Sequence, residues 1–584
     1  MAGSGGLVAA GPGTPGLVPK TGRFAVIEQF LADGIDHMFG NPGTVEQGFL
    51  DALAEYPDMK YVLTLHETVA VMIGDGYARA RRKPALVQIH STPGLGNAIG
   101  ALYQANRGHA PLVVIGGDAG LRYVPMEAQM YGDLVGMARP VTKWATMVAD
   151  PASLLRTIRR AIKVAATPPM GPVYVCLPAD VLDQPVVEAA RPTSIPSTAT
   201  VPDAAWIDQA AAALAAARRP MIFMGDGVAY SGAQAELERV AELLGAEVWG
   251  VDSGELNMRF DHALYRGQTG HMFGSASLPI TQRGDVVLIV GTYVLPEVFP
   301  ELGDIFAPEA TVIHVDLNAY EIAKSHRVDL GVVAEPRRTL AAIATALESR
   351  LDDAHRAANE ARARELADLK AETHRAQVEA DTANRDATPL HFSAFAAELA
   401  RQAPADLVLF DEALTSSPDV TRYLPPTLAG HFFQTRGGSL GVGFPGAIGV
   451  QLANPGKTVI GVSGDGGSMY TIQALWTAAR HNVPAKFVVA NNGSYKLLQM
   501  NVDQYWKERD IPKHDYPLSF DLSQPPLQFA ELARGMSVQA VRVEKPWEIA
   551  PAIREMLAFP GPFLIDLVLE SDTHPERIGV ACGQ

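Results

Sequence analysis

Short apolar runs alternate along most of the chain with longer segments in which apolar residues recur every three or four positions. The alternation is clear from residue 21 to about residue 190, and again from about 388 to 570. Between these regions, strand-like runs occur at Met221–Met224, Asp285–Val290 and Thr311–Val315. Apolar strands that alternate with helices are typical of parallel sheets with helices on both faces. The pattern therefore predicts an α/β protein of three doubly wound parallel-sheet units, without a repeat of fixed period.

Segments that lack this alternation divide the chain. Residues 1–20 are rich in Gly, Ala and Pro, with no basic start before an apolar stretch, and predict a flexible tail instead of a signal peptide. A connector rich in Pro, Ser and Thr spans 191–202, and a charged, Ala-rich helical pattern at 351–387 predicts a solvated linker helix. The expected domains and the C-terminal tail are then 21–190, 203–350, 388–570 and 571–584.

Composition and charge exclude several classes of protein. With 584 residues the chain is too long for one hydrophobic core. The net charge of −16 without a basic run argues against nucleic acid or an anionic membrane as the main partner. Two cysteines, Cys176 and Cys582, cannot form a disulfide framework or a Cys-rich metal site. No apolar run is long enough to span a bilayer, so we expect a cytoplasmic protein.

A polar cluster follows two predicted strands of the third unit. Gly464-Asp465-Gly466 comes directly after the apolar run 458–463, and Asn491-Asn492 follows the run 485–490. The intervening segment 469–481 has helical period. Neighbouring parallel strands lie only about 4.8 Å apart, so side chains at their carboxyl ends can reach one ion.

The ligand types at this edge indicate a particular kind of ion. Asp465 and Asn492 offer only oxygen, which suits Mg²⁺ or Ca²⁺ better than zinc. The glycines, and a helix expected to begin near Ser468, would present backbone N–H groups to an anion. The sequence therefore predicts a site for a divalent cation that carries a diphosphate.

The spacing of this motif resembles that of thiamine diphosphate enzymes, in which GDG is followed after about two dozen residues by an asparagine pair. Two other GDG tripeptides, at 74–76 and 225–227, lack such a pair and are interpreted as a helix interior and a strand-to-helix turn. The resemblance implies thiamine diphosphate with Mg²⁺ as cofactors. It also implies that Asp465, Asn492 and the main-chain oxygen of Ser494 are the metal ligands.

A second cluster lies in the first unit. Glu67 follows a strand-like run at 61–66 and precedes a helical pattern at 68–82, and a carboxylate at a helix start is often only a favourable charge for the helix dipole. Two further polar segments, 40–44 and 90–94, also follow strands of this unit. The carboxyl ends of strands are where such sheets bind ligands. We therefore expect a binding site here.

The first unit is similar to the pyrimidine-binding domain of benzoylformate decarboxylase and acetolactate synthase. The resemblance implies that Glu67 hydrogen-bonds N1′ of the aminopyrimidine, where a shared proton favours the 4′-imine that deprotonates the thiazolium C2. A partly buried carboxyl group suits that exchange. The resemblance covers roughly residues 21 to 575.

The glycine-rich segment 437–449 completes the resemblance. Gly438 would accept a hydrogen bond from the 4′-amine, and Leu440 would bend the cofactor; the alternative is a loop that only lets helices approach. The remaining implied cofactor contacts are Asn41, Pro42, Gly43, Thr44, Thr415, Gly464, Gly466, Gly467, Ser468 and Tyr495.

His90 is the second candidate catalytic residue, because it would face C2 from a strand end and can transfer protons near neutral pH. The alternative for a lone histidine is a structural imidazole, which is the interpretation for His66 and His109. The resemblance to benzoylformate decarboxylase favours function for His90.

Some positions depart from the related enzymes. Val298 stands where benzoylformate decarboxylase has a second histidine, and Met130 where acetolactate synthases have a glutamine. Leu497, Leu498 and Met500 are expected to line the substrate pocket, although each could equally be helix core. Leu497 would leave little room for an aromatic ring, so small aliphatic substrates are plausible.

We expect a carbon–carbon lyase or carboligase acting on 2-oxo or 2-hydroxyacyl substrates, first of all a 2-oxo acid decarboxylase of the benzoylformate decarboxylase type. The alternatives are a 2-hydroxyacyl-CoA lyase, an acetolactate-synthase-like carboligase, and a non-catalytic relative. The presence of His90 is a modest argument against the CoA lyase. The presence of Glu67, Asp465 and Asn492 argues against a non-catalytic role.

The resemblance also bears on partners and on the middle unit. In this family the cofactor lies between two subunits, so a homodimer or a homotetramer is implied, with Glu67 from one subunit and Asp465 from the other. Some relatives bind ADP or FAD in the central domain. Gly225 and Gly227 lack the third glycine of a dinucleotide fingerprint, so neither nucleotide is indicated.

Overall fold

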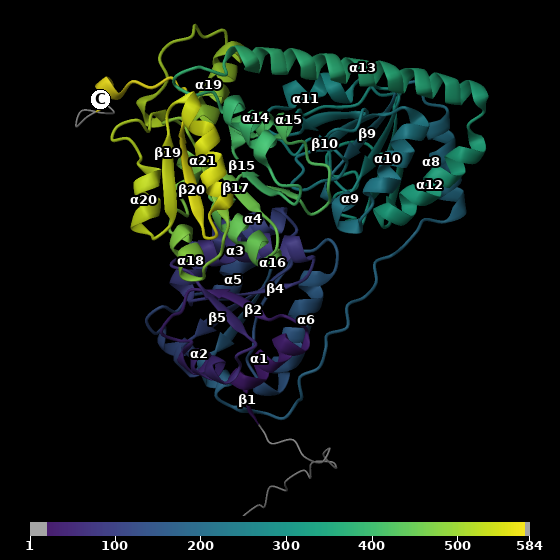
Figure 1. Cartoon of the computed structure of the whole chain (residues 1–584). Coiled ribbons are helices and arrows are strands. Elements are labelled where there is room, and N and C mark those ends of the chain that lie inside the picture. The colour runs from purple at the N-terminus through teal and green to yellow at the C-terminus, as the bar shows by residue number, and fades with distance from the viewer. Residues whose placement is uncertain (1–19, 579–584) are drawn as a thin grey trace, which may run out of the picture.

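The computed structural model describes residues 20–578. Within this range the chain forms three six-stranded parallel sheets with helices on their faces. Figure 1 shows the N-terminal domain at the bottom, the central domain at the upper right and the C-terminal domain at the upper left. The predicted class, an α/β protein of three doubly wound parallel sheets, is confirmed. The predicted N-terminal tail lies outside the described residues except for Lys20, as do residues 579–584 of the C-terminal tail.

The N-terminal sheet has the strand order β3-β2-β4-β5-β7-β6. Its strands are β2 His37–Gly40, β3 Lys60–Leu63, β4 Ala85–Ile89, β5 Leu112–Asp118, β6 Trp144–Met147 and β7 Val173–Pro178. Its helices are α1 Gly22–Ala32, α2 Gln47–Ala52, α3 Glu67–Arg81, α4 Thr92–Arg107, α5 Leu134–Ala138, α6 Leu154–Ala166 and α7 Ala179–Leu182. Strand β1, Lys20–Thr21, pairs antiparallel with β8, Pro185–Val186.

Successive residues of the sheet strands are buried on opposite faces. Leu86 belongs to the core on the side of α1 and α6, whereas Val87 belongs to the core on the side of α3 and α4. Because both faces are covered by helices, the strands read as continuous apolar runs instead of alternating apolar and polar residues.

The central sheet has the order β11-β10-β9-β12-β13-β14, so the chain switches direction between β9 and β12. Its strands are β9 Pro220–Met224, β10 Glu247–Val251, β11 Tyr265–Thr269, β12 Val286–Val290, β13 Thr311–Asp316 and β14 Leu330–Val333. Its helices are α8 Ala204–Ala215, α9 Asp226–Ser231, α10 Gln234–Leu244, α11 Gly274–Thr281 and α12 Pro336–Arg350.

The C-terminal sheet has the order β16-β15-β17-β18-β20-β19. Its strands are β15 Val408–Glu412, β16 Phe432–Gln434, β17 Val459–Gly464, β18 Lys486–Asn491, β19 Gln539–Val543 and β20 Phe563–Val568. Its helices are α14 Phe392–Gln402, α15 Ser417–Tyr423, α16 Gly443–Ala453, α17 Asp465–Ser468, α18 Ala474–Arg480, α19 Lys496–Glu508, α20 Phe529–Gly535 and α21 Pro546–Ala558.

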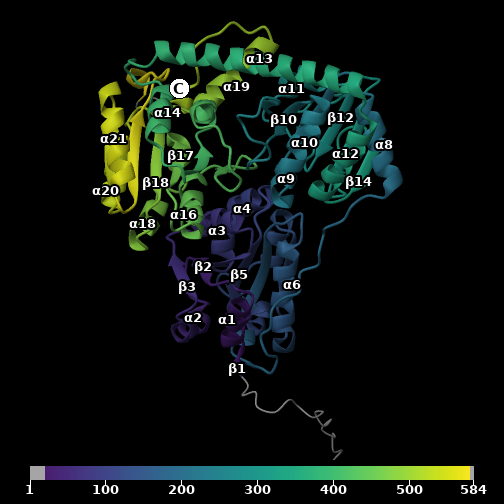
Figure 2. The same cartoon turned by 45° about the vertical axis from the view of Figure 1, so that its right-hand side comes forward.

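Two segments connect the domains. Helix α13, Asp353–Ala383, has 31 residues and runs across the top of the central and C-terminal domains in both views (Figures 1 and 2). The connector 191–202 follows the outside of the molecule from the N-terminal to the central domain (Figure 2). No helix within residues 20–578 combines the length and the apolar character that crossing a bilayer requires.

Helices α3 and α16 form the joint between the N-terminal and C-terminal domains (Figure 2). A Cβ atom on Gly76 would lie 2.2 Å from the carbonyl oxygen of Gly446, and one on Gly449 would lie 2.0 Å from that of Ile73. The helices are thus antiparallel and approach so closely that only glycine fits at these points. The GDG tripeptide 74–76 lies inside α3, as the sequence predicts, and serves this packing.

Arg79 of α3 ties all three domains together. Its side chain is 1% exposed and donates hydrogen bonds to the carbonyl oxygen of Gly254 in the central domain, at 2.7 Å, and to that of Gln434 in the C-terminal domain, at 3.2 Å. Asp75 and Glu255 lie 3.5 and 3.4 Å from its guanidinium group. Buried hydrogen-bonded ion pairs of this kind fix relative positions, because any displacement leaves a buried charge unpaired.

Candidate functional site

The carboxyl edge of the C-terminal sheet brings the predicted metal ligands together. Strands β17 and β18 are adjacent and parallel, with Gly464 opposite Ala490. Asp465 and Asn492 therefore leave neighbouring strands at the same level. Asn491 instead ends β18, and its side chain donates to the buried Asp566 at 2.9 Å, which gives it a structural role.

Asp465 is a buried carboxylate held by backbone N–H groups. It is 3% exposed and accepts hydrogen bonds from Gly466 at 2.7 Å and from Gly493 at 2.6 Å. Burial raises the pKa of Asp465 to about 6, although these N–H groups oppose the rise. Within residues 20–578 the carboxylate forms no ion pair with lysine or arginine. A divalent cation is the counter-charge that this donor set fits.

Asn492 and Ser494 lie beside this carboxylate. The amide oxygen of Asn492 accepts from the backbone N–H of Ser494 at 3.0 Å, and the Ser494 hydroxyl lies 2.8 Å from that of Ser571. Ser571 belongs to the predicted C-terminal tail, so the first residue of that tail contacts the site. The described chain contains no cluster of three or more His, Cys, Asp or Glu, so the candidate metal site depends on one carboxylate with amide and main-chain oxygens.

The prediction that a helix begins near Ser468 is wrong. Helix α17 begins at Asp465 and ends at Ser468, and the next helix, α18, begins only at Ala474. The chain turns between them because Thr471 donates its hydroxyl to the carbonyl oxygen of Gly441, at 2.5 Å. Donors for an anion therefore come from the short turn after β17 and not from the dipole of a long helix.

The glycine-rich loop, residues 437–442, lies beside this edge. Gly437, Gly438 and Gly441 have φ values of +67°, +71° and +98°, which other residues rarely adopt. A Cβ atom on Gly438 or on Gly464 would meet no atom within 4 Å, so a ligand can approach both backbones. Leu440 is half-buried in the loop, and Thr415 is half-buried in the turn after β15.

Glu412 fixes the glycine-rich loop, and sequence reasoning missed it. This buried carboxylate, the last residue of β15, accepts from the backbone N–H groups of Gly441 at 2.7 Å and Gly443 at 2.8 Å. It also accepts from the Ser463 hydroxyl at 2.9 Å. The available signal was an acidic residue directly after an apolar strand.

The carboxyl edge of the N-terminal sheet holds the second candidate group. Glu67, the first residue of α3, is 5% exposed. The side-chain amides of Asn41 and Asn97 donate to its two oxygens at 3.1 and 3.0 Å. Gly94 leaves space for this carboxylate, since a Cβ atom there would lie 2.8 Å from it. Glu67 and Asn41 were predicted, whereas Asn97, thirty residues further along, was not.

The loop after β2 and the residue after β4 lie at the same edge. Pro42 and Thr44 are exposed, and Gly43 packs against the ring of His90. His90 itself contacts a carboxylate oxygen of Glu46 through Nδ1, at 3.2 Å, and Sδ of Met130 through Nε2, at 3.2 Å.

The two histidines interpreted as structural have local partners. His66 caps α3 by accepting from the Thr68 N–H, and Nδ1 of His109 lies 3.2 Å from the carbonyl oxygen of Met170. Burial beside Arg436 lowers the pKa of His109 to about 4.

The predicted substrate-pocket residues lie on α19. Leu497 is half-buried, whereas Leu498 and Met500 are 40% and 54% exposed. Tyr495, at the start of this helix, packs its ring against Gly466, where a Cβ atom would lie 2.5 Å from it. Val298 is 62% exposed in the central domain.

The two candidate groups of one chain lie at opposite ends of the α3–α16 pair. Glu67 begins α3 nine residues before Gly76, which contacts Gly446, three residues into the antiparallel α16. At about 1.5 Å per helical residue, Glu67 is roughly 18 Å along the helix pair from the beginning of α16. The glycine-rich loop packs against α4, where a Cβ atom on Gly100 would lie 3.6 Å from Oγ of Ser439.

Three family models match the chain. They are the N-terminal TPP binding domain of thiamine pyrophosphate enzymes at residues 20–137, the central domain at 207–343 and the C-terminal TPP binding domain at 415–567. The chain belongs to the thiamine pyrophosphate enzyme family. Thiamine pyrophosphate is the same compound as thiamine diphosphate, so the predicted family is confirmed.

Similar proteins cover the chain almost from end to end. A benzoylformate decarboxylase of Pseudomonas aeruginosa is 30% identical over 94% of this chain and 98% of its own length. A probable acetolactate synthase large subunit of Methanocaldococcus jannaschii is 28% identical over 94% and 92%. The solved structure of a thiamine diphosphate-dependent 4-hydroxybenzoylformate decarboxylase of Rhodococcus jostii RHA1 has a TM-score of 0.80 at 26% identity, covering 95% of this chain and all of that one.

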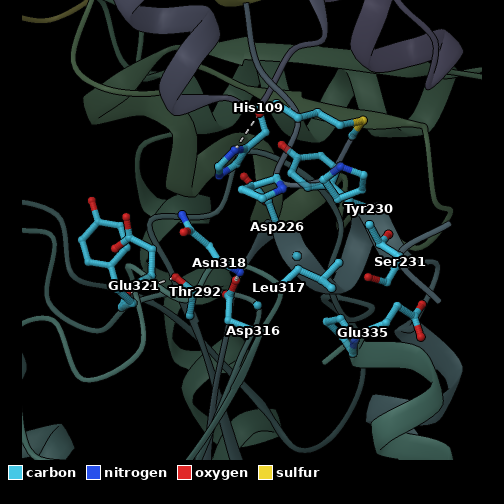
Figure 3. A pocket seen from close by; sticks show the side chains of 18 of the residues that line it. His109, Asp226, Tyr230, Ser231, Thr292, Asp316, Leu317, Asn318, Glu321 and Glu335 are labelled. Carbon is cyan, nitrogen blue, oxygen red and sulfur yellow. Dashed lines mark hydrogen bonds between the residues drawn. The ribbon is translucent and has the colours of Figure 1, made fainter. Parts of the chain in front are cut away.

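A pocket of about 560 Å³ opens at the carboxyl edge of the central sheet of this family member (Figure 3). Asp226, Thr292 and Asp316 line it from the ends of β9, β12 and β13, and His109 lines it from the N-terminal domain. Burial raises the pKa of Asp316 to about 7. The pocket thus occupies the switch point of the sheet, where doubly wound folds bind ligands.

The glycines of the turn at 225–227 are explained by packing. A Cβ atom on Gly225 would lie 2.4 Å from Cβ of Thr292, and one on Gly227 would lie 2.5 Å from Cα of Gly291. Both glycines let the turn after β9 approach the end of β12. The tripeptide is therefore a strand-to-helix turn, as the sequence predicts.

Proposed function

We propose that this protein is a thiamine diphosphate- and Mg²⁺-dependent carbon–carbon lyase or carboligase, and first of all a 2-oxo acid decarboxylase of the benzoylformate decarboxylase type. The observation that carries the proposal is the pair of buried carboxylates, Glu67 and Asp465, at the carboxyl edges of two domains that match thiamine pyrophosphate binding models. The alternatives are an acetolactate-synthase-like carboligase and a 2-hydroxyacyl-CoA lyase, which would release formyl-CoA with an aldehyde or ketone.

Asp465, Asn492 and the main-chain oxygen of Ser494 would hold Mg²⁺. Asp465 supplies the negative charge, and its fixed backbone donors keep both oxygens directed to the edge of the sheet. Backbone N–H groups of Gly467 and Ser468 would bind the diphosphate oxygens, while the N–H of Gly466 holds Asp465.

When bound, thiamine diphosphate supplies a nucleophilic carbon and then an electron sink. Glu67 would hold a proton at N1′ of the pyrimidine, and Asn41 and Asn97 orient its carboxyl group. The carbonyl oxygen of Gly438 would accept from the 4′-amine, with Leu440 beneath the bend of the cofactor.

His90 would transfer protons to and from the substrate. It lies at a strand end of the same edge as Glu67, and a histidine can do so near neutral pH. Leu497, Leu498 and Met500 would bound the substrate, and the bulk of Leu497 favours small aliphatic chains. The exposed Val298 cannot replace a second active-site histidine as a proton donor.

We further propose that the active unit is at least a homodimer, with each site shared between two copies. Glu67 and the beginning of α16 in one chain are roughly 18 Å apart along the helix pair. Ser463, two residues before Asp465, lies beside the beginning of α16, since a Cβ atom on Gly443 would be 3.0 Å from its Cβ atom. Glu67 and Asp465 of one chain therefore lie at opposite ends of the helix pair, whereas two copies could supply one group each to the same site. A pair of such dimers would form a tetramer.

Mixed dimers test the shared site. Glu67→Gln and Asp465→Asn chains, each inactive alone, would form hybrid dimers in which one site carries both substitutions and the other carries neither. Refolding an equal mixture together should restore about a quarter of the wild-type turnover. If co-refolding restores nothing although hybrids are detected by native mass spectrometry, each site is contained in a single chain.

A substrate screen tests the reaction. The purified protein, with added thiamine diphosphate and Mg²⁺, should be given 2-oxo acids, 2-hydroxyacyl-CoA thioesters and pairs of aldehydes, with products identified by mass. We expect decarboxylation of small aliphatic 2-oxo acids. Cleavage of thioesters alone would replace the decarboxylase by the CoA lyase, and the absence of any turnover would favour a non-catalytic relative.

The central pocket supports a second, smaller proposal, namely that a nucleotide such as ADP or FAD binds there. A volume of about 560 Å³ lies within the range of ligand pockets, and Asp316 ends a strand where an acidic residue can bind ribose hydroxyls. Added ADP or FAD should raise the melting temperature, and bound FAD would colour the protein yellow. If neither compound shifts the melting temperature, this proposal is wrong.

A cytoplasmic location of the protein stays a prediction.

A further inference from the structure

Glu46 is a buried carboxylate to which the proposed reaction gives no role. It precedes α2 at the capping position, but its side chain accepts no hydrogen bond from that helix. Its two oxygens lie 3.3 and 3.2 Å from Nδ1 of His90. A carboxylate that turns away from an adjacent helix N-terminus forgoes a favourable interaction there. Its carboxylate also meets the backbone N–H groups of Gly43 and Gly117, and His90 is its side-chain partner.

Two glycines leave the space in which Glu46 and His90 meet. A Cβ atom on Gly43 would lie 1.9 Å from Nδ1 of His90, and one on Gly117 would lie 2.2 Å from Oε1 of Glu46. Any side chain at either position would push the pair apart. Gly43 follows β2 and Gly117 lies in β5, so two segments that are distant in the sequence both lack a side chain where they meet this contact.

Among the described residues, His90 is the basic side chain within 4 Å of the Glu46 carboxylate, at 3.2 Å. The titratable groups that face the pair or its immediate neighbours from the adjoining strands and helix are Tyr61, Glu67, Asp118, Tyr174 and Cys176. All of these are acidic or neutral. Burial raises the pKa of Glu46, and the charge of His90 acts in the opposite direction. An imidazolium at His90 would therefore find its compensating charge in Glu46.

The other ring nitrogen of His90 points to a movable side chain. Nε2 lies 3.2 Å from Sδ of Met130, a weak hydrogen-bond acceptor on a long flexible chain. Met130 has a φ of +72°, an unusual backbone conformation for a methionine, in the segment between β5 and α5. Rotation of this side chain would open Nε2 without disturbing the contact at Nδ1.

We propose that Glu46 is the positioning residue of His90, holding the imidazole through Nδ1 so that Nε2 exchanges the proton with the substrate. The proposal rests on the proposed function, since it needs His90 as a proton-transfer group. The hydrogen bond at one imidazole nitrogen decides which nitrogen carries the proton. A carboxylate at Nδ1 keeps a proton there, leaves the lone pair of Nε2 free, and stabilises the imidazolium once Nε2 has taken a proton.

The Glu46→Gln variant removes the charge and keeps the shape and an oxygen acceptor. We expect kcat to fall about 10- to 100-fold, the effect typical of groups that orient a functional histidine. KM and the calorimetric affinity for thiamine diphosphate with Mg²⁺ should stay within a few-fold, because Glu46 touches neither. An unchanged kcat would overturn the proposal.

A double variant shows whether Glu46 acts through His90. In the His90→Gln background, where two neutral amides can still hydrogen-bond each other, adding Glu46→Gln should cause no further loss, because residues that act as a unit are not additive. The same fold-loss in both backgrounds would show a structural role for Glu46 and overturn the proposal.

A third measurement needs neither cofactor nor substrate. The slow exchange of the His90 ring C–H for deuterium, followed by mass spectrometry of its peptide across the neutral pH range, depends on the protonation of the ring. Removing the carboxylate should move the midpoint of this profile to lower pH. If the wild type proves inactive, the proposed function fails but this profile still tests the contact; an unmoved midpoint would overturn it.

Asp118→Asn is the matched control. Asp118 is likewise buried at the carboxyl edge of this sheet, 7% exposed, but its side chain accepts from the N–H of Gly120, at 2.9 Å, instead of contacting His90. This variant should leave the exchange midpoint of His90 where it is in the wild type. A shift as large as that of Glu46→Gln would mean that any lost buried charge has the effect, and would also overturn the proposal.

Discussion

The N-terminal and C-terminal sheets place a buried carboxylate at the same topological position and hold it in different ways. Glu67 and Asp465 are each the first residue of the helix that follows a strand. Glu67 accepts from the side-chain amides of Asn41 and Asn97, whereas Asp465 accepts from the main chain.

The difference fits the two roles that we propose, proton exchange for Glu67 and metal binding for Asp465. A side-chain amide carries both donors and an acceptor, so Asn41 and Asn97 can hydrogen-bond either a carboxylate or a carboxyl group at Glu67. Main-chain N–H groups cannot turn, and they favour the ionised form of Asp465 that a cation needs. One topology thus carries the group that we propose for proton exchange in one domain and the metal ligand that we propose in the other.

Asp465→Asn is expected to have the largest effect. It removes the one carboxylate of the candidate metal site, and we expect the affinity for thiamine diphosphate with Mg²⁺ to fall more than about 100-fold, beyond the loss caused by removing a supporting group. Calorimetry measures this. Without cofactor, the melting temperature should not fall, because a buried charge without a counter-charge disappears. Unchanged cofactor affinity would place the metal elsewhere.

Glu67→Gln should lower kcat strongly and leave the cofactor affinity almost unchanged, the reverse of what we expect for Asp465→Asn. Loss of a positioned proton-transfer group costs about 10²- to 10⁴-fold in kcat, while binding of the cofactor should change only a few-fold. Steady-state kinetics together with calorimetry separate the two quantities. A variant that turns over like the wild type would end the assignment of Glu67, and one that loses cofactor binding would make it a ligand-holding group like Asp465.

The parts of the site that sequence could predict are those set by the ends of neighbouring strands. Asp465, Asn492 and Glu67 follow apolar strands directly or closely, and the order of a doubly wound sheet brings such residues to one edge. Strand β18 lies one residue later than the predicted run 485–490 and so includes Asn491. This position explains why Asn491 has a structural role while Asn492 lies at the site.

Other parts depend on contacts between distant segments. The break between α17 and α18 follows from a hydrogen bond of Thr471 to Gly441, thirty residues away, and helical period alone cannot reveal it. Glu46, Asn97 and Glu412 were missed for the same reason, since each acts on a group 29 to 44 residues distant in the chain. The 18 Å separation that supports a shared site likewise needs the packing of α3 on α16.

Asn97→Ala tests the side-chain amides that hold Glu67 and should have a smaller effect than the loss of the carboxylate. It removes one of the two amides at Glu67 and leaves the carboxylate in place, so we expect a loss of about 1 kcal/mol, or roughly a five- to tenfold fall in kcat. The fall should be much smaller than for Glu67→Gln, with cofactor affinity nearly unchanged. A loss equal to that of Glu67→Gln would show that the amide is essential in itself.

Asp316→Asn extends the comparison to the central sheet, where a carboxylate ends β13 and accepts from the N–H of Asn318 at 2.6 Å. Burial raises its pKa from 3.8 to about 7, so the folded protein binds a proton that the unfolded chain has lost. The stability that this proton contributes is fully present below about pH 3.8 and is lost as the pH rises to about 7. Without added nucleotide, the variant should therefore melt about 2 °C higher than the wild type above pH 7, with the gap closing towards pH 4. If the difference in melting temperature between variant and wild type does not change with pH, Asp316 is ionised over the whole range, as a carboxylate with a fixed counter-charge would be. Asp316 would then differ from Asp465, whose pKa burial raises.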